Sequence, residues 1–425
     1  MVKITIKNVG PIKEAVLDLK KYNILIGQQS TGKSTLAKIA CYCSWVEKEI
    51  SINQGSGDFK KEGYFENSLT EFHKLNGYLT SNSVIKYKSD ILTFNFSKNK
   101  FSFKWGENRL SYKRRKTLYI PAERSIVSVI PNWFEVNLGQ NNTRSFLADW
   151  ERVRKYFVKE NPLRILNFGI YYYNPADKSD HIITETGQDI LMSIASSGLQ
   201  SMIPLQALIH YYGDIFYRED LTSKESNIFQ QSKFDNLFFE LYKHVHENLS
   251  QNKKTELEAL RAATTDTKTS RKKLQDFLEE NIYKHLFLIL DQIQFPKSTA
   301  FFIEEPELNL YPITQYNFIN NLVELVNKYS HSVFITTHSP YILTSLNNLI
   351  YAAEKSKQNE NAVDKIIPKA QWIDRSDVSA WKINANTNEL ENLLDEDIPM
   401  LKAEELDDVS QTINQEFDAL FEIES

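Results

Sequence analysis

The N-terminal part of the chain alternates apolar and polar residues in a way that predicts strands followed by a helix. The run KITIKNVGPIKEAVLDLK alternates twice, and Gly10-Pro11 between the two halves is a turn signal. A shorter apolar run, Tyr22–Ile26, predicts a third strand, and a helix is expected from Lys33 to about Lys48. The third strand therefore leads through a short loop into a helix.

The loop between this strand and this helix has the spacing GxxxxGK[ST] of a phosphate-binding loop. The loop residues and the threonine after them are Gly27, Gln28, Gln29, Ser30, Thr31, Gly32, Lys33, Ser34 and Thr35. Glycines let backbone N–H groups wrap around phosphates, and a helix N-terminus favours negative charge. We expect Lys33 to reach the terminal phosphates of ATP and the Ser34 hydroxyl to bind Mg²⁺. The alternative, a chance match in a glycine-rich turn, is disfavoured by the strand and the helix on either side.

A buried strand in the C-terminal third ends in consecutive carboxylates. Ala300–Ile303 is apolar, and Glu304-Glu305-Pro306-Glu307 follows it. One carboxylate at a strand end can hold Mg²⁺ through water, and its neighbour can orient and deprotonate an attacking water. We assign Glu304 to the metal and Glu305 to the water. The alternative is a solvated acidic turn after a buried strand.

Two shorter features point to the same kind of site. His338 stands at the end of another predicted strand, Val333–Thr336, at the edge where α/β sheets bind ligands. The alternative is a structural role, which is the usual one for a lone histidine. The segment Ser196-Ser197-Gly198-Leu199-Gln200 opens an apolar helix, and small residues at a helix N-terminus suit an anion. Taken alone, this segment is better interpreted as a plain helix cap.

In order and wording these motifs resemble those of ABC-type ATPases of the SMC, RecF and OLD group. The match begins with the N-terminal strands and the Walker A loop. It continues through the signature-like SSGLQ and the Walker B strand FFIEEPELNLYP to the switch histidine in TTHSP. It covers roughly residues 1–130, 185–215 and 298–350. The resemblance implies an α/β fold: a P-loop ABC-type ATPase head with a mixed sheet, an antiparallel β subdomain and a helical insertion.

In that group two heads sandwich two nucleotides, and the signature of one head caps the phosphate bound by the other. The resemblance therefore implies ATP and Mg²⁺ as cofactors and a homodimer or higher homo-oligomer. It implies that Glu305 is the catalytic base, that His338 senses the γ-phosphate, and that Glu307–Asn309 lies near the dimer seam. The implied trans signature consists of Ser196, Ser197, Gly198 and Gln200, with Ser197 and Gly198 touching the γ-phosphate.

The chain departs from the pattern of the group at two points. The Gln28-Gln29 pair replaces the usual asparagine of the Walker A loop, a change that a loop working through its backbone tolerates. No glutamine occurs between Gln54 and Gln140, where the Q-loop residue that reads Mg²⁺ is expected. The segment LYIPAERS resembles a motif of compact members of the group and puts Glu123 or Arg124 near the nucleotide. The alternative is a strand that ends in a proline turn with a surface ion pair.

Four segments are expected along the chain. Residues 1–213 form the N-terminal part of the ATPase head, 214–297 a helical insertion, 298–350 the C-terminal part of the head, and 351–425 a small cap with an acidic helix. Apolar positions on either side of TTDTKTS predict two helices hinged there, which suit a docking surface for a partner or a helical lid. Residues 85–116 predict a β-hairpin with interleaved aromatic and basic side chains. These lysines suit either a nucleic-acid backbone or protection of a sheet edge, and we favour the second.

Composition limits the classes of partner. The chain has 425 residues and a net charge of −5, but an acidic stretch from Glu389 onward leaves residues 1–388 with a net charge of +7. A mildly basic body is compatible with a nucleic acid as partner. No apolar run is long enough for a membrane span, and the N-terminus lacks the apolar region of a signal peptide. We therefore expect no membrane partner. Cys41 and Cys43 face apart on a predicted helix, so we expect no disulfide and a protein of the reducing cytoplasm.

We interpret the chain as an ATPase that senses a signal and regulates a separate effector. OLD-type proteins continue into a TOPRIM nuclease domain, but here about 75 residues follow Ile350, and we expect no nuclease in them. The chain resembles the ATPase subunits of bacterial anti-phage defence systems such as PARIS and Septu, which implies a separate TOPRIM or HNH nuclease as effector. The alternative is a RecF- or SMC-like DNA-binding ATPase that acts as an ATP-switched clamp in DNA repair. A small-molecule kinase is disfavoured, because Glu305 and His338 suit attack by water.

Overall fold

The structure is a computed structural model that describes most of the chain. The described residues are 2–130, 136, 138–219, 231–262, 268–384, 387–395, 400–402, 415–416, 418 and 421. The acidic final helix expected from the sequence lies outside this set, apart from four residues. No helix within the described ranges is long and apolar enough to cross a membrane.

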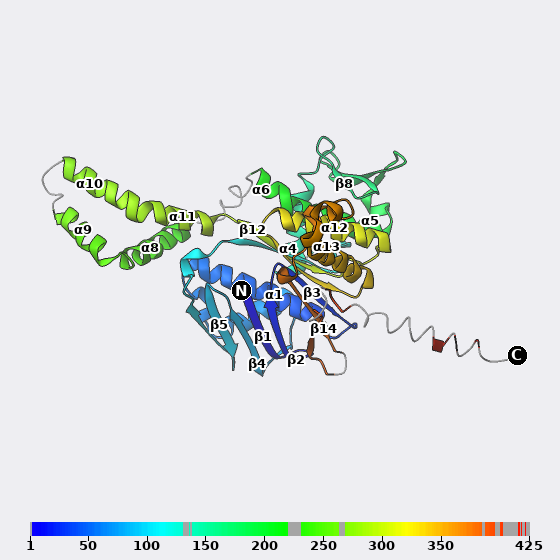
Figure 1. Ribbon diagram of the computed structural model, residues 1–425, viewed down its shortest axis with the longest axis horizontal. Helices are drawn as coiled ribbons and strands as arrows, with labels where there is room; N and C mark the ends of the chain where they lie inside the picture. The colour runs from blue at the N-terminus through cyan, green and yellow to red at the C-terminus, as the bar shows by residue number, and fades with distance from the viewer. Residues whose placement is uncertain are drawn as a thin grey trace.

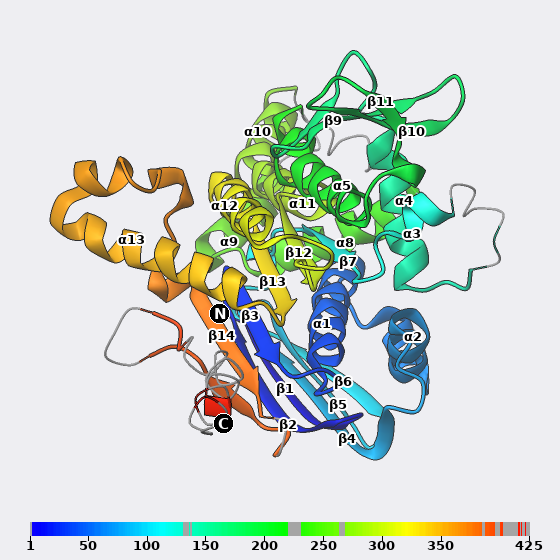
Figure 2. The ribbon, with the colours of Figure 1, turned by 90° about the vertical axis from the view of Figure 1, so that its right-hand side faces the viewer.

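A six-stranded sheet runs through the middle of the molecule (Figure 2). Its strands are, in order, β15 (Leu390–Asn392), β14 (Val378–Ile383), β3 (Tyr22–Gly27), β13 (Ser332–Thr337), β12 (Ser298–Glu304) and β7 (Arg115–Ile120). The strands from β14 to β7 run parallel, and β15 is antiparallel to β14. Every residue of β12 and β13 is buried, as in parallel strands covered on both faces. The predicted mixed sheet is confirmed.

Helices cover both faces of this sheet, and alternate strand residues enter two separate cores. On β3, Ile24 and Ile26 pack in one core, and Leu25 packs in the other. The first core is completed by α4 (Asn142–Arg154), α5 (Ser197–His210), α12 (Pro312–Lys328) and α13 (Pro340–Asp364). The second core is completed by α1 (Lys33–Asn53), α2 (Tyr64–His73) and a second sheet.

The second sheet is antiparallel and contains the predicted hairpin. Its strands are, in order, β2 (Ile12–Leu19), β1 (Val2–Val9), β4 (Leu79–Lys88), β5 (Leu92–Ser97) and β6 (Lys100–Trp105). In the hairpin Phe94 lies opposite Phe103, and Phe96 lies opposite Phe101. Phe94 and Phe96 are buried in the second core, so the aromatic residues of this segment are required for packing.

A third sheet, which the sequence patterns did not predict, precedes the signature helix α5. Its strands are, in order, β11 (Asp189–Leu191), β10 (Ser179–Thr184), β9 (Gly169–Asn174) and β8 (Leu163–Ile165). Two short helices complete this half of the head, α3 (Ile126–Val129) and α6 (Phe216–Arg218). Single turns of 3₁₀ or π-helix lie at Gly57–Lys60, Arg109–Ser111, Met192–Ile194, Tyr211–Ile215, Glu279–Tyr283, Lys369–Gln371 and Arg375–Asp377.

A helical arm projects from the head (Figure 1). It consists of α8 (Gln231–Glu247), α9 (Gln251–Ala262), α10 (Lys268–Leu278) and α11 (Lys284–Gln294). Apolar residues of these helices form a third core, which includes Ile52 and Tyr112 from the head. The arm is therefore anchored near the C-terminal end of α1.

Candidate functional site

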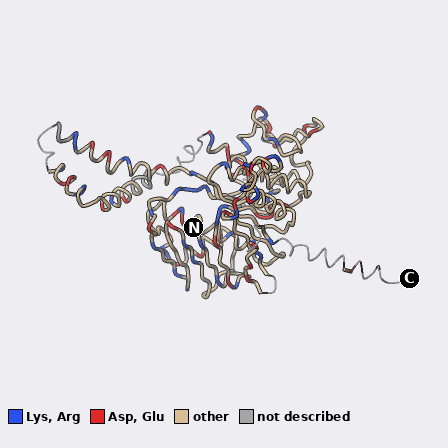
Figure 3. Tube along the Cα trace, viewed as in Figure 1, with Lys and Arg blue, Asp and Glu red and all other residues tan. Residues whose placement is uncertain are grey.

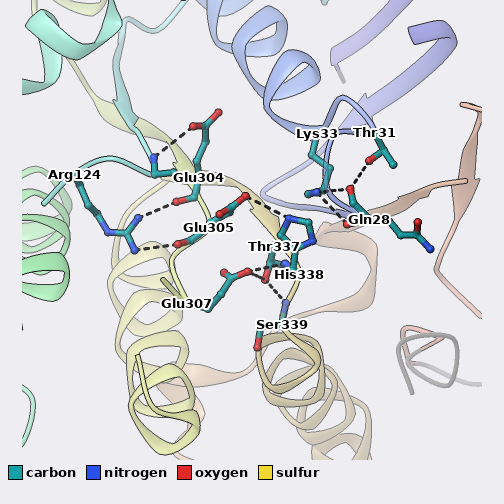
Figure 4. Close-up of polar contacts among 12 residues, drawn as sticks. Gln28, Thr31, Lys33, Arg124, Glu304, Glu305, Glu307, Thr337, His338 and Ser339 are labelled. Carbon is teal, nitrogen blue, oxygen red and sulfur yellow. Dashed lines mark hydrogen bonds and ion pairs between the residues drawn. The ribbon is translucent and has the colours of Figure 1, made fainter. Parts of the chain in front are cut away.

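The phosphate-binding loop connects β3 to α1 at the carboxyl edge of the central sheet. Lys33 is buried, and its Nζ donates hydrogen bonds to the carbonyl oxygens of Gly27 (3.0 Å) and Gln28 (2.9 Å) (Figure 4). The hydroxyl of Thr31 donates to the same Gln28 carbonyl at 2.8 Å. Burial lowers the pKa of Lys33, while the nearby carboxylates of Glu305, Glu307 and Glu304 act to raise it. A phosphate entering the loop would replace the carbonyls as partner of this ammonium group.

Gly32 is required by the close approach of the β1–β2 turn. Its φ is +105°, in the left-handed region that side chains rarely adopt. A Cβ atom at Gly32 would lie 2.6 Å from Cδ1 of Ile12 and 2.9 Å from Cγ of Pro11. The Gly10-Pro11 turn that the sequence predicted therefore packs directly against the phosphate-binding loop.

Glu304 ends strand β12 with a buried carboxylate. Oε1 accepts a hydrogen bond from the hydroxyl of Tyr119 on β7, and Oε2 accepts one from the backbone N–H of Ala122 at 3.4 Å. Burial, reinforced by Glu304, raises the pKa of Tyr119, so the phenol stays a donor. Figure 4 shows the Glu304 carboxylate pointing away from Glu305 and Lys33. Tyr119 was not predicted from the sequence, because a tyrosine on an apolar strand carries no motif.

Glu305 and His338 contact each other at the carboxyl ends of β12 and β13. The distance from Oε1 of Glu305 to Nε2 of His338 is 3.4 Å (Figure 4). The hydrogen bond from His338 lowers the pKa of Glu305, which keeps the carboxylate ionised. Glu305 has a φ of +42°, and its N–H donates to the carbonyl oxygen of Thr336 at 2.8 Å. A glutamate in the left-handed region is uncommon, and such strain is concentrated at functional sites.

Glu307 holds the segment that carries His338. Its Oε1 accepts hydrogen bonds from the hydroxyl of Thr337 (2.9 Å) and from the backbone N–H of His338 (2.6 Å). Within the described ranges its buried Oε2 has no hydrogen-bond partner. The position of Glu307 near a dimer seam stays a prediction. The structure shows a different role, in which its carboxylate fixes the segment that carries His338.

Arg124 is fully buried and bonds to backbone carbonyl groups. Its guanidinium donates to the carbonyl oxygens of Glu304 (3.0 Å), Glu305 (3.0 Å), Pro306 (3.1 Å), Ser201 (3.1 Å) and Pro121 (3.5 Å). Burial lowers the pKa of Arg124 to about 10, so it remains a cation at neutral pH. The interpretation of this residue as half of a surface ion pair is wrong. Arg124 joins the end of the Walker B strand to the signature helix.

The signature-like segment forms the exposed start of α5. Ser196 is the N-cap, and its hydroxyl accepts a hydrogen bond from the N–H of Leu199 at 3.5 Å. Ser197 is exposed as well, and Gln200 donates to backbone carbonyls of the turn before the helix. A Cβ atom at Gly198 would lie 2.9 Å from the carbonyl oxygen of Asn309, which follows Walker B. Both segments therefore meet at one surface, with the serine hydroxyls open to solvent.

The turn after β7 lies beside the end of strand β12. Strand β7 pairs with β12, and the backbone N–H of Ala122 contacts Glu304 directly after it. Glu123 in the same turn is exposed. The turn therefore contacts Walker B through a backbone group and through Arg124.

The comparisons with known proteins give one family match. Residues 218–343 match the family model of an AAA ATPase domain, which includes β12, Glu304, Glu305, β13 and His338. This match covers less than a third of the chain. None of the curated proteins matches its sequence significantly.

Solved structures that the chain resembles include the SMC head domain from Thermotoga maritima, at 8% identity and a TM-score of 0.34, covering 81% of this chain and 90% of that chain. An SMC head bound to the C-terminal winged-helix domain of ScpA has 8% identity, a TM-score of 0.35, and coverage of 92% and 95%. The recombination mediator RecF has 11% identity, a TM-score of 0.29, and coverage of 92% and 97%.

Proposed function

We propose that the ATPase binds ATP with Mg²⁺ at the phosphate-binding loop and hydrolyses it at an interface between two heads. The observation that carries this proposal is the Glu305–His338 contact, held by Glu307 and Arg124 at the sheet edge that also presents Lys33. A carboxylate kept ionised by its neighbour is suited to accept a proton from water. A histidine beside it is suited to contact the terminal phosphate.

In the reaction, Glu305 accepts a proton from water while the water oxygen bonds to the γ-phosphorus and the bond to ADP breaks. Lys33 balances the negative charge of the terminal phosphates. Ser34 and Glu304 supply oxygen donors of the kind that Mg²⁺ prefers, and Glu304 would act through water because Tyr119 and Ala122 already hold its carboxylate. The ion, when bound, neutralises charge on the transferred phosphoryl group.

Exposed apolar side chains support an interface between two heads. Ile194 precedes the signature and is 73% exposed, Tyr311 follows Walker B at 76%, and Tyr341 follows the switch histidine at 51%. Large apolar residues are more often buried, so their exposure next to these three motifs suits a surface that a partner head covers. We place the trans signature, Ser196, Ser197, Gly198 and Gln200, in this interface, opposite the phosphate-binding loop of a partner head.

We further propose that nucleotide state controls a separate effector, of which a nuclease in anti-phage defence is the leading candidate. The projecting arm supports this, because Phe239, Phe287 and Leu288 are 64%, 59% and 58% exposed on α8 and α11. An apolar surface on an arm distant from the ATP site suits a protein partner. An added nuclease that binds in only one nucleotide state would support this role, and indifference to nucleotide would reject it.

A basic face on the antiparallel sheet favours the alternative role, a DNA-binding ATPase. Because Ile4, Ile85 and Phe94 point into the core, the outward positions of the same sheet carry lysines. These are Lys3, Lys7, Lys86, Lys88, Lys100 and Lys104. Lys3 lies opposite Lys88 in the strand register, although Asp18 and Glu14 offset part of the charge. Binding to duplex DNA that weakens steeply with salt, and weakens further in Lys86→Gln/Lys88→Gln, would favour this role.

Light scattering with ATP and Mg²⁺ tests the head–head interface. Glu305→Gln should accumulate a nucleotide-dependent dimer or larger oligomer, since ATP is bound but not hydrolysed. Adding Ser197→Arg in that background should abolish the association by placing a bulky cation at the seam. Ser330→Arg, an exposed serine at the opposite edge of the sheet, is the matched control and should leave association unchanged. An assembly indifferent to ATP and to Ser197→Arg would reject the trans arrangement.

A further inference from the structure

A second cleft opens beside the edge strand β7, away from the phosphate-binding loop. Its volume is about 630 Å³, within the range of small-molecule sites. It is lined by the part of α1 between Cys41 and Ile52, by α2, by β7 and by α4. The phosphate-binding loop lies at the other end of α1, so the two sites are separate.

The cleft concentrates positive charge. Five Lys or Arg side chains and three Asp or Glu side chains line it. Lys48 comes from α1, Lys116 lies on β7, and Arg114 just before it donates a hydrogen bond to the carbonyl oxygen of Gln294 on α11. Figure 3 shows basic residues along the segment where the arm meets the head. Burial lowers the pKa of Lys48, and Arg114 and Lys116 lower it further against the opposing effect of Glu49. Crowded cations in a partly buried cleft are costly, and a bound anion would relieve that cost.

Two of the three acids are already paired within the cleft. Lys116 lies 2.8 Å from Asp149, and Lys48 lies 3.4 Å from Glu49. Each of these side chains is at most 25% exposed, so solvent screens the cations less than it would at the open surface.

Aromatic rings form the other wall. Tyr42 and Trp45 of α1 pack with ring centroids 5.4 Å apart and line the cleft together with Phe72 of α2. His73 also lines it and is 1% exposed, and its Nδ1 has no hydrogen-bond partner among the residues that the structure describes. A planar base could stack on such a wall and offer a polar atom to His73.

One residue that lines the cleft also contacts the Walker B strand. Tyr119 lines the cleft, and its hydroxyl donates the hydrogen bond that holds Glu304. The rings of Tyr119 and His73 are in edge contact, with centroids 5.6 Å apart. A ligand that moves His73 or Tyr119 would therefore change the support of the Glu304 carboxylate.

We propose that this cleft is a regulatory site for a nucleotide monophosphate. The phosphate contacts the cations Lys48, Arg114 and Lys116, and the base lies against the Tyr42–Trp45 wall. Tyr119 transmits occupancy to Glu304. The site goes beyond the ATPase reaction, because it takes a second ligand and uses none of the phosphate-binding loop.

Isothermal titration calorimetry with AMP and with GMP tests the site. The protein used for this titration carries Lys33→Ala, which weakens nucleotide binding at the phosphate-binding loop, so the measured heat reports on the second cleft. The titration contains no ATP and therefore does not depend on ATP hydrolysis. One of the two nucleotides should bind at one site per chain, and adding Lys48→Gln should weaken its affinity about tenfold or more. Lys365→Gln, at the exposed C-cap of α13 and outside the lining of the cleft, should bind as the parent does. Absence of binding of both nucleotides at 1 mM, or equal affinity in the two added variants, overturns the proposal.

The coupling is tested by ATP hydrolysis in the otherwise unaltered chain. The nucleotide that binds should change the rate in wild type, and Lys48→Gln should remove this change while keeping any competition at the phosphate-binding loop. Tyr119→Phe, combined with Lys33→Ala, should bind the nucleotide as tightly as the parent, yet Tyr119→Phe alone should lose the rate change. An unaltered response in Tyr119→Phe would reject Tyr119 as the connection. A protein that hydrolyses no ATP but binds the nucleotide would refute the proposed ATPase function and leave the second site standing.

Discussion

Replacing Arg124 should destabilise the fold and the site together. Its guanidinium makes four hydrogen bonds of 3.0–3.1 Å to the carbonyls of Ser201, Glu304, Glu305 and Pro306. At roughly 1.5–3 kcal/mol for each bond to a charged group, the gross contribution is about 6–12 kcal/mol. The cost of burying the charge offsets several kcal/mol, and Arg124→Met would no longer bear it. We therefore expect Arg124→Met to lower the free energy of unfolding by about 3–5 kcal/mol.

Arg124→Lys separates hydrogen bonding from charge. The lysine ammonium still carries the desolvation cost of a buried charge, but its single nitrogen cannot reach carbonyls on both the Walker B strand and α5. The loss should therefore be at least as large as in Arg124→Met. Urea unfolding followed by tryptophan fluorescence gives both values, and ATP hydrolysis gives the effect on the site. Arg164→Met is the matched control, since this side chain is 72% exposed and pairs with Glu185 at 3.6 Å. Equal stability of Arg124→Met and Arg164→Met, or a near-native Arg124→Lys, would refute the reasoning.

Three further predictions concern the site. Glu307→Ala removes the acceptor that fixes the switch segment, so ATP hydrolysis should fall by about tenfold while binding of a fluorescent ATP analogue is retained; a loss of binding instead would contradict this role. His338→Ala removes the hydrogen bond that lowers the pKa of Glu305. Because Glu305 is ionised above its lowered pKa and protonated below it, the acid limb of the pH–rate profile should move to higher pH, and an unmoved limb would count against the contact. Gly32→Ala forces a Cβ against Ile12 in a left-handed conformation and should cost about 1–3 kcal/mol of unfolding free energy in urea, together with nucleotide binding; wild-type affinity would show that the loop can shift.

Short-range patterns were enough to find the phosphate-binding loop and the strands next to the Walker B and switch motifs. In these cases the chemistry lies within a few residues of the strand that presents it, as with Lys33 after β3 and Glu305 after β12. The sequence could likewise place a hairpin at β5 and β6, because alternation and a polar turn are local signals.

The residues that support these motifs could not be found in this way. Tyr119 on β7 and Arg124 in the turn after it contact β12, which lies far away in the sequence, and the pairing of β7 with β12 sets their partners. A charged residue after a proline turn is usually exposed, so a surface ion pair stayed open as one of two alternatives, and the burial of Arg124 excludes it. The role of Glu307 as acceptor for the His338 backbone likewise depends on the adjacency of β12 and β13.

The position of β14 in the central sheet affects the order in which the sheet can assemble as the chain is synthesised. Tyr22 on β3 pairs with Val333 on β13 on one side and with Val378 on β14 on the other. Both neighbours of β3 therefore come from the C-terminal quarter of the chain. Contacts between such distant residues form slowly, because a long loop must close first. During synthesis β3 would have no neighbour in the central sheet until β13 has emerged, and one open edge until β14 follows. Unpaired strand edges invite aggregation, so the nascent N-terminal segment should depend on a chaperone or on its own antiparallel sheet until the ribosome has released β14.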